Sequence, residues 1–228
     1  MNRSKYDLER PENYDSLLPL VIPSWELYYG TVAEYIGQGA RRILELASGT
    51  GILTTIIKKK RPGSDIVCID KNPEMLIVAR KKPELREVTF IEGDILEEWP
   101  EGPFDAVVTT QCLFSFSAAK RGQIAKKAYH TLSDGGVFLN GDMFHPGNDW
   151  EFAVYTSRLK KFMCDNGLSE DVADMMLGPL DPMIRDHTAS DFCSILRRVG
   201  FSRTAIPYRN GLYGIVLGIR SGEVSTLW

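Results

Sequence analysis

Residues 43–54 have the sequence Ile-Leu-Glu-Leu-Ala-Ser-Gly-Thr-Gly-Ile-Leu-Thr, and this segment is the most informative in the chain. Its first four residues are mostly apolar and predict a buried strand. Gly49 and Gly51 allow a tight turn in which the backbone comes close to a ligand. A helix is predicted from about residue 50 to residue 60, and the free N–H groups of its first turn point back into the loop. The segment therefore predicts a site that holds a small polar molecule against bare backbone.

The spacing of the small residues separates two kinds of ligand. A dinucleotide site requires Gly-x-Gly-x-x-Gly after the strand, but Thr54 stands where the third glycine would be. The chain has instead Glu45-x-Ala47-x-Gly49-x-Gly51. This pattern resembles the first motif of the class I S-adenosylmethionine-dependent methyltransferases, in which an acid is followed by three alternating glycines. Ala47 stands in place of the first of those glycines.

Further segments extend the resemblance in the order that the family has. A second predicted strand ends on Asp70, about 20 residues after Gly51, where an acid binds ribose hydroxyls in nucleotide-binding sheets. A third ends near Asp94, at the place where an acid of this family bonds the adenine amino group. The matching segments are residues 43–54, 66–70, 88–95, 104–109 and 132–139. The resemblance covers residues 41–142, with a weaker similarity at the C-terminus.

The resemblance implies an α/β fold with a seven-stranded, mostly parallel, doubly wound sheet that ends in an antiparallel hairpin. We expect a single domain over residues 1–228. Its parts are an N-terminal helical lid over residues 1–38, a cofactor-binding core over 41–142, a helical insertion after the fifth strand over 146–187, and a last helix with the closing hairpin over 188–220.

The resemblance also implies that S-adenosyl-L-methionine is the cofactor. The backbone of the glycine loop would hold the methionine part, Asp70 the ribose, and Asp94 with Ile95 the adenine, on which Met75 packs. The residues expected to bind the cofactor are Tyr14, Glu45, Ala47, Gly49, Gly51, Asp70, Lys71, Met75, Asp94, Ile95 and Gln111. Asp105, near the start of its strand, is expected to be structural.

Catalysis needs little from the protein, because the sulfonium of the cofactor already activates the methyl group for direct SN2 transfer. A hydroxyl acceptor would need a general base, whereas an amine needs only orientation. His145 and Tyr28 are the residues we assign to catalysis. Asp142, His187 and the other tyrosines of the predicted helix over residues 25–36 are the further candidates for the base. No metal site is expected, since Thr109, Thr110 and Gln111 stand where a metal-dependent catechol-type enzyme would have carboxylates.

The composition indicates the kind of protein and the compartment in which it works. The chain has 228 residues, 43% hydrophobic and 25% charged, with a net charge of −3, as is usual for a soluble globular protein. No apolar run is long enough for a membrane span, and residues 1–11 lack the apolar core of a signal peptide. The four cysteines have no Cys-x-x-Cys spacing, so we expect reduced thiols and a cytoplasmic protein.

We expect the acceptor to be a small molecule, chosen by residues 146–187 and by the aromatic helix over residues 25–36. The alternative is an RNA-modifying enzyme of the same fold that acts on a tRNA base. The basic runs at residues 58–61 and 80–82 fit the C-terminal ends of helices better than a nucleic-acid surface, so nucleic acid is an unlikely partner. A nicotinamide-dependent reductase and a protein that senses the cofactor without chemistry rank last. The sequence leaves open the acceptor atom and the oligomeric state.

Overall fold

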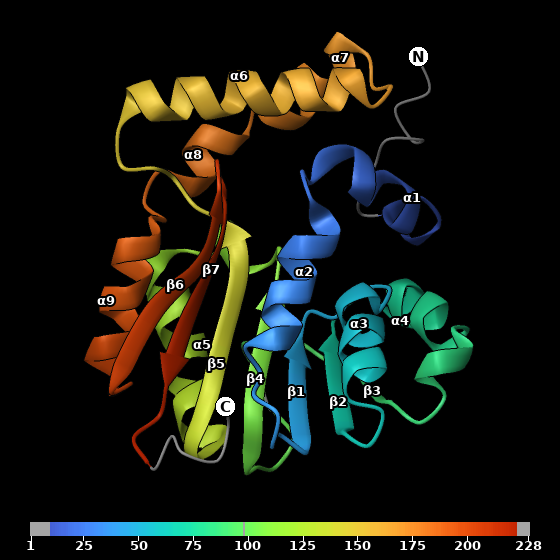
Figure 1. Cartoon of the computed structure of the whole chain (residues 1–228), viewed down its shortest axis with the longest axis vertical. Helices are drawn as coiled ribbons and strands as arrows, with labels where there is room; N and C mark the ends of the chain where they lie inside the picture. Colours follow the sequence, from blue (N-terminus) through green and yellow to red (C-terminus); the bar gives the residue numbers. More distant parts are fainter. Residues whose placement is uncertain (1–9, 98, 223–228) are drawn as a thin grey trace.

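A computed structural model describes residues 10–97 and 99–222 and contains a seven-stranded sheet. The strands lie in the order β3-β2-β1-β4-β5-β7-β6 (Figure 1). Their bounds are β1 Arg42–Leu46, β2 Asp65–Asp70, β3 Thr89–Glu92, β4 Phe104–Thr110, β5 Leu132–Met143, β6 Arg203–Asn210 and β7 Tyr213–Ile219. The first five strands pair in parallel, and β7 pairs antiparallel with both β5 and β6. The predicted fold class, including the closing hairpin, is confirmed.

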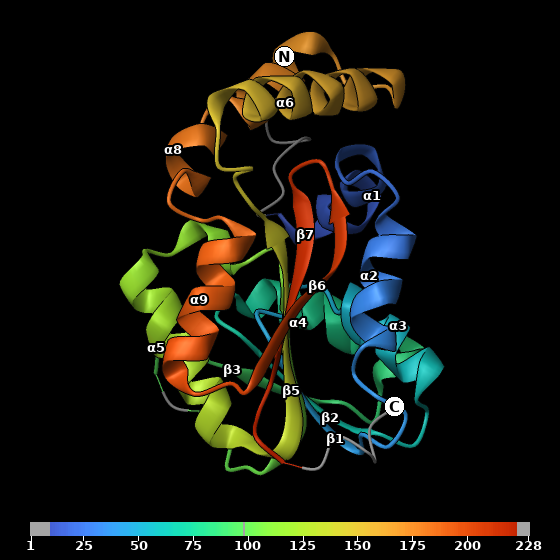
Figure 2. The same ribbon diagram turned by 60° about the vertical axis from the view of Figure 1, so that its left-hand side comes forward.

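Helices cover both faces of the sheet, as a parallel sheet requires. Figure 2 shows α2 and α3 on one side and α5 and α9 on the other. The core on the first side includes Tyr28, Ile43 and Ile57, and that on the second includes Leu44, Phe138 and Phe192. The helices are α1 Pro11–Val21, α2 Trp25–Glu34, α3 Ile52–Lys60, α4 Pro73–Arg80, α5 Ala118–Thr131, α6 Asp149–Asp165, α7 Glu170–Leu177, α8 Leu180–Ile184 and α9 Ala189–Val199, with short 3-10 turns η2 Pro83–Leu85 and η3 Leu113–Ser115.

The insertion after β5 folds into three helices that lie across the end of the sheet (Figure 1). Asn148 caps α6 as its spacing to Glu151 predicts, because its side chain accepts the Glu151 N–H at 2.8 Å. Thr188 caps α9 in the same way through the Asp191 N–H. The short α8 was not predicted, since Gly178-Pro179 indicates a stop and Pro182 lies within the helix. None of the helices among the described residues is long and apolar enough to cross a membrane.

The N-terminal segment holds two helices rather than the one that the aromatic spacing predicts. α1 contains Pro19, and α2 begins at Trp25. Ser24 precedes α2, where a serine would favour an N-cap, but its φ is 54°, a left-handed conformation, and its side chain makes no capping bond. Residues 1–9 of the expected lid and residues 223–228 lie outside the described residues.

Asp105 fastens the lower end of the sheet, which confirms its expected structural role. Its Oδ2 accepts the backbone N–H groups of Arg41 and Arg42 at 2.8 and 3.0 Å, where the chain enters β1. Its Oδ1 accepts the hydroxyl of Ser133, near the start of β5, at 3.3 Å. One carboxylate thus joins the entrance of β1 to β4 and β5.

We predict that Asp105→Ala lowers the free energy of unfolding by about 1–3 kcal/mol, because two N–H groups lose a charged acceptor. Urea unfolding followed by circular dichroism measures this loss. The control is Asp134→Ala, which removes only an exposed ion pair with Arg220 at 3.4 Å and should cost less than about 1 kcal/mol. Equal effects of the two substitutions would contradict the role assigned to Asp105.

Candidate functional site

The loop between β1 and α3 winds through three left-handed residues at alternating positions. The φ angles are 53° at Ala47, 55° at Gly49 and 79° at Gly51. Glycine adopts this region freely, whereas alanine does so at a cost of about 1–2 kcal/mol. Ala47 is therefore accommodated with strain, at the position where the resembling motif has glycine.

The two glycines of this loop face different surroundings. A Cβ added to Gly49 would meet no atom within 4 Å, so Gly49 borders open space. A Cβ added to Gly51 would lie 2.7 Å from Leu85 Cδ1, so Gly51 is required by packing against η2. Gly49 is thus the glycine whose backbone is open to a ligand.

Asp70 ends β2 beside this loop and holds it in place. Its Oδ2 accepts the Gly49 N–H at 2.7 Å, and its Oδ1 accepts the Asn72 N–H at 2.8 Å. The side chain is 7% exposed. Each carboxylate oxygen has a second acceptor site, so Asp70 can still accept two hydroxyl hydrogens.

Glu45 lies in β1 below the loop and is buried. Its Oε2 accepts the Thr54 hydroxyl at 2.7 Å, which ties the strand to α3. Burial raises the pKa of Glu45 from 4.5 to about 8, against the lowering effect of the Thr54 hydrogen bond. The nearby charge of Asp70 raises this pKa further.

The residues expected around the adenine and ribose follow β2 and β3. Met75 and Ile95 are buried and apolar, as an adenine contact requires. Asp94 is exposed, and its Oδ1 accepts the Leu96 N–H at 2.8 Å. Lys71 is exposed directly after Asp70. These side chains therefore lie along one edge of the sheet, in the order that the sequence predicts.

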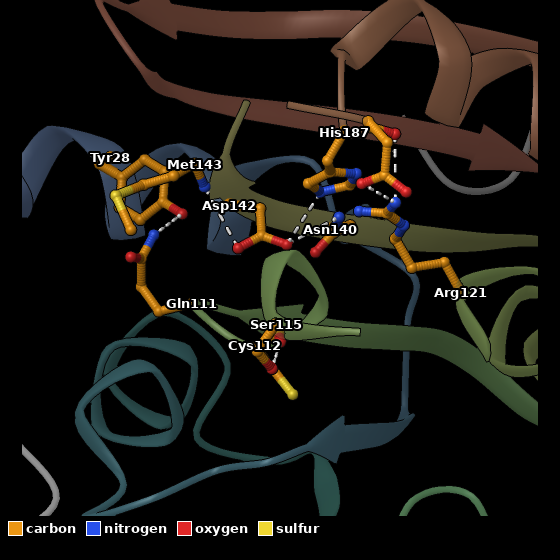
Figure 3. A network of polar contacts seen from close by, with 10 residues as sticks. Tyr28, Gln111, Cys112, Ser115, Arg121, Asn140, Asp142, Met143 and His187 are labelled. Carbon is orange, nitrogen blue, oxygen red and sulfur yellow. Dashed lines mark hydrogen bonds and ion pairs between the residues drawn. The ribbon is translucent and has the colours of Figure 1, made fainter. Parts of the chain in front are cut away.

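Gln111 follows β4 in a left-handed conformation, with a φ of 53°. Its backbone N–H donates to the Gly141 carbonyl at 2.8 Å, and its Nε2 donates to the Tyr28 hydroxyl at 2.8 Å (Figure 3). A non-glycine residue held in this conformation is typical of functional sites. Two strand ends and α2 thus fix the wall on which the Gln111 side chain lies.

An uncharged cavity of about 380 Å³ adjoins this wall. Gln111 and Tyr14 line it, together with residues of α1, η3 and the three helices of the insertion. None of the described residues that line it is Asp, Glu, Lys, Arg or His. Most of its surface is apolar and flexible, with four methionines: Met143, Met163, Met176 and Met183. The sequence predicts that residues 146–187 choose the acceptor, and Met176 of that segment lines the cavity. It does not predict the contributions of Leu18 and Val21 of α1 or of α8, which depend on long-range packing.

Tyr14 and Asp15 bring α1 onto the loop. Burial raises the pKa of Tyr14 to about 12, which keeps its phenol protonated. Asp15 accepts the hydroxyl of Thr50, within the glycine loop, and forms an ion pair with Lys82 at 2.8 Å. α1 therefore contacts the loop on one side and lines the cavity on the other.

His145 and Tyr28, the two residues assigned to catalysis, do not line this cavity. His145 is buried and stacks on Phe152, with ring centroids 5.1 Å apart, and its Nδ1 accepts the Gly147 N–H. Tyr28 is buried, and burial raises its pKa well above the usual value. Both side chains have structural partners in this geometry, which does not favour a role as general base.

Asp142 and His187, the other candidate bases, form a buried pair outside the cavity lining. His187 Nε2 lies 3.2 Å from Asp142 Oδ2 (Figure 3). Beside them, the fully buried Arg121 donates to the backbone and the carboxylate of Asp186. The two pairs fasten the end of the insertion to the sheet. Sequence reasoning missed Arg121, because a basic residue within a helix gives no signal of burial.

The chain is similar in sequence and in fold to known proteins. Residues 43–136 match a family model described as a methyltransferase domain. A demethylmenaquinone methyltransferase of Thermus thermophilus is 39% identical over 99 residues, which are 42% of this chain and 44% of the relative. The match therefore spans less than half of that relative.

Two solved structures show the same fold. A protein of Methanococcus maripaludis assigned to the S-adenosyl-L-methionine-dependent methyltransferases has a TM-score of 0.63 and 18% identity, covering 98% of this chain and 97% of its own. Human N-acetylserotonin methyltransferase, solved in complex with S-adenosylmethionine, has a TM-score of 0.65 and 18% identity, covering 96% of this chain and 57% of its own.

We predict that Glu45 makes the folded protein less stable as the pH rises from about 4.5 to about 8. In this window the unfolded chain loses the Glu45 proton while the folded chain keeps it, so unfolding becomes more favourable. The Glu45→Gln variant lacks this titrating group. Between pH 5 and pH 8, the free energy of unfolding of the original chain should therefore fall by at least about 1 kcal/mol relative to that of the variant. Parallel pH profiles in urea unfolding would contradict the raised pKa.

Proposed function

We propose that the chain is a class I S-adenosylmethionine-dependent methyltransferase, because residues 43–136 match a methyltransferase-domain model, and that it transfers the methyl group of S-adenosyl-L-methionine to a small, largely apolar acceptor. The observation that carries this proposal is the uncharged, methionine-rich cavity against Gln111 and Tyr14, at the strand ends that carry the glycine loop. Ligand sites of α/β sheets lie at such strand ends.

The residues of the loop fit S-adenosyl-L-methionine. Gly49 leaves room for a ligand against its backbone, and Asp70 has free acceptor sites for two ribose hydroxyls. Met75 and Ile95 offer apolar surface to the adenine, and Asp94 lies beside them. When bound, the cofactor supplies an activated methyl group. The protein's own contribution is to fix the two reactants and to exclude water.

The acceptor would be positioned rather than deprotonated by the cavity. The Tyr14 phenol stays protonated at neutral pH, so it can donate a hydrogen bond but cannot take a proton. The candidate bases His145, Asp142 and His187 lie outside the lining. An acceptor that is nucleophilic before it binds, or that loses its proton to solvent, suits this site best.

The charges around the fold favour a small molecule over RNA. Three of the basic side chains at the helix ends have acidic partners: Lys58 pairs with Glu87, Lys60 with Glu34, and Lys82 with Asp15. The described residues that line the cavity include no cation that would bind a phosphate backbone. The T. thermophilus relative is named for methylation of a quinone, which is also a small molecule.

The experiment that tests the proposal has two parts. Calorimetric titration with S-adenosylhomocysteine should show binding, and titration with NAD should show none. Radiolabelled S-adenosyl-L-methionine, supplied with an apolar metabolite extract or with total tRNA, should label a small molecule and leave the tRNA unlabelled. Labelled tRNA, or the absence of S-adenosylhomocysteine binding, would overturn the proposal.

We predict that Asp70→Ala weakens S-adenosylhomocysteine binding at least tenfold, because a buried carboxylate loses its bonds to the ribose and releases the Gly49 N–H. The matched control is Asp65→Ala, at the exposed opposite end of β2, which pairs only with Arg42 at 3.6 Å. Calorimetry on both variants, after circular dichroism shows that each is folded, measures the difference. Equal affinities would remove Asp70 from the cofactor site.

Met176 and Met175 provide a neighbouring pair for testing the acceptor cavity. Met176 lines the cavity, whereas Met175 is exposed and does not. Met176→Gln should lower kcat/KM for the labelled acceptor at least tenfold, because it places a polar group in an apolar site. Met175→Gln should leave it unchanged, and affinity for S-adenosylhomocysteine should move less than about threefold in either variant. Equal losses of kcat/KM in the two variants would place the acceptor elsewhere.

A further inference from the structure

A second cavity of about 230 Å³ lies beside the acceptor cavity. It is bounded by α6, by the turn between β6 and β7, and by the link between α1 and α2. Tyr155, Arg158 and Phe162 come from α6, Asn210 and Leu212 from the turn, and Pro23 from the link. No residue of the cofactor loop contributes to it.

The two cavities share a wall. Leu159 and Tyr213 line both of them. Adjacent residues of α6 and of the link between α1 and α2 line different cavities: Met163 and Ile22 the first, Phe162 and Pro23 the second. Tyr213 is fixed, because its hydroxyl donates to the Val21 carbonyl at 3.0 Å. Leu159 is a buried apolar side chain at the boundary between the two cavities.

The second cavity differs from the first in its charge. Arg158 lines it with an exposed side chain, and among the described residues no carboxylate forms an ion pair with this guanidinium. Glu151, on the same helix, accepts the Tyr155 hydroxyl at 3.0 Å and is a hydrogen-bond partner of Asn148. An exposed guanidinium at the edge of a cavity, with no ion pair among the described residues, favours an anionic group.

We propose that the acceptor site continues past Leu159 into the second cavity, and that the acceptor is amphipathic, with an apolar body in the first cavity and a terminal carboxylate against Arg158. This inference rests on the proposed function, because the first cavity is taken as the acceptor site. The methyl-accepting atom lies at the Gln111 end, and the carboxylate lies at the far end beyond α6.

The test uses decanoate and decanol as probes, with calorimetry on the full chain saturated with S-adenosylhomocysteine. Decanoate should bind at least tenfold more tightly than decanol. Arg158→Gln should abolish that preference, and Arg158→Lys should retain most of it. Lys161→Gln, on the same helix but paired with Asp165 and outside both cavities, should leave it unchanged. Higher salt should reduce the preference, since part of the cavity mouth is open to solvent.

A second variant tests the passage. Leu159→Trp should fill the wall between the cavities and weaken decanoate at least tenfold, while binding of S-adenosylhomocysteine is unchanged. Equal binding of the two probes, or a preference for decanoate that survives Arg158→Gln, overturns the inference. In those cases S-adenosylhomocysteine binding remains, so the proposed function stands. Loss of S-adenosylhomocysteine binding by the unaltered chain overturns the proposed function instead.

Discussion

The hydrogen bond from the Gly49 N–H to the Asp70 carboxylate joins the turn after β1 to the end of β2. Three left-handed residues in a short loop would have several conformations if the loop stood alone. The charged acceptor at 2.7 Å selects one of them and leaves the backbone open at Gly49. The strain at Ala47 is compensated by this bond and by the packing of Gly51 on Leu85. The place of a ligand on the sheet therefore depends on one carboxylate.

The acceptor cavity has a different origin from the loop. Its walls come from α1, from the end of β4 and from the insertion, which are distant from one another in the sequence. The buried pair His187–Asp142 joins the end of the insertion to β5, and the buried guanidinium of Arg121 joins it to α5 through the exposed Asp186, so the roof of the cavity is held at its far end (Figure 3). Removing one partner would leave a buried polar group without its hydrogen bond, which is costly. The proposed acceptor site is thus more dependent on tertiary packing than the proposed cofactor site is.

This difference explains how much the sequence could predict. The seven-stranded sheet with its antiparallel closing hairpin follows from motifs in the sequence, and the structure confirms it. Asn72, Asn148 and Thr188 cap their helices, as residues of these types favour. The left-handed conformations of Ala47, Gln111 and Ser24 could not be predicted, because tertiary contacts impose them against the preference of the residues. The burial of His145 under Phe152 gave no signal either, since a histidine after a strand is equally compatible with a base and with a packed ring. The second cavity depends on the meeting of α6 with the β6–β7 turn.

α1 touches both halves of the proposed site. Asp15 accepts the Thr50 hydroxyl in the cofactor loop and pairs with Lys82, while Leu18 and Val21 of the same helix line the acceptor cavity. A helix that both reactants contact gives them a shared element. If one reactant orders α1, the other meets a helix whose ordering entropy is already lost. The affinities are then linked by one coupling free energy, which acts equally in both directions, so that each reactant raises the affinity for the other by the same factor.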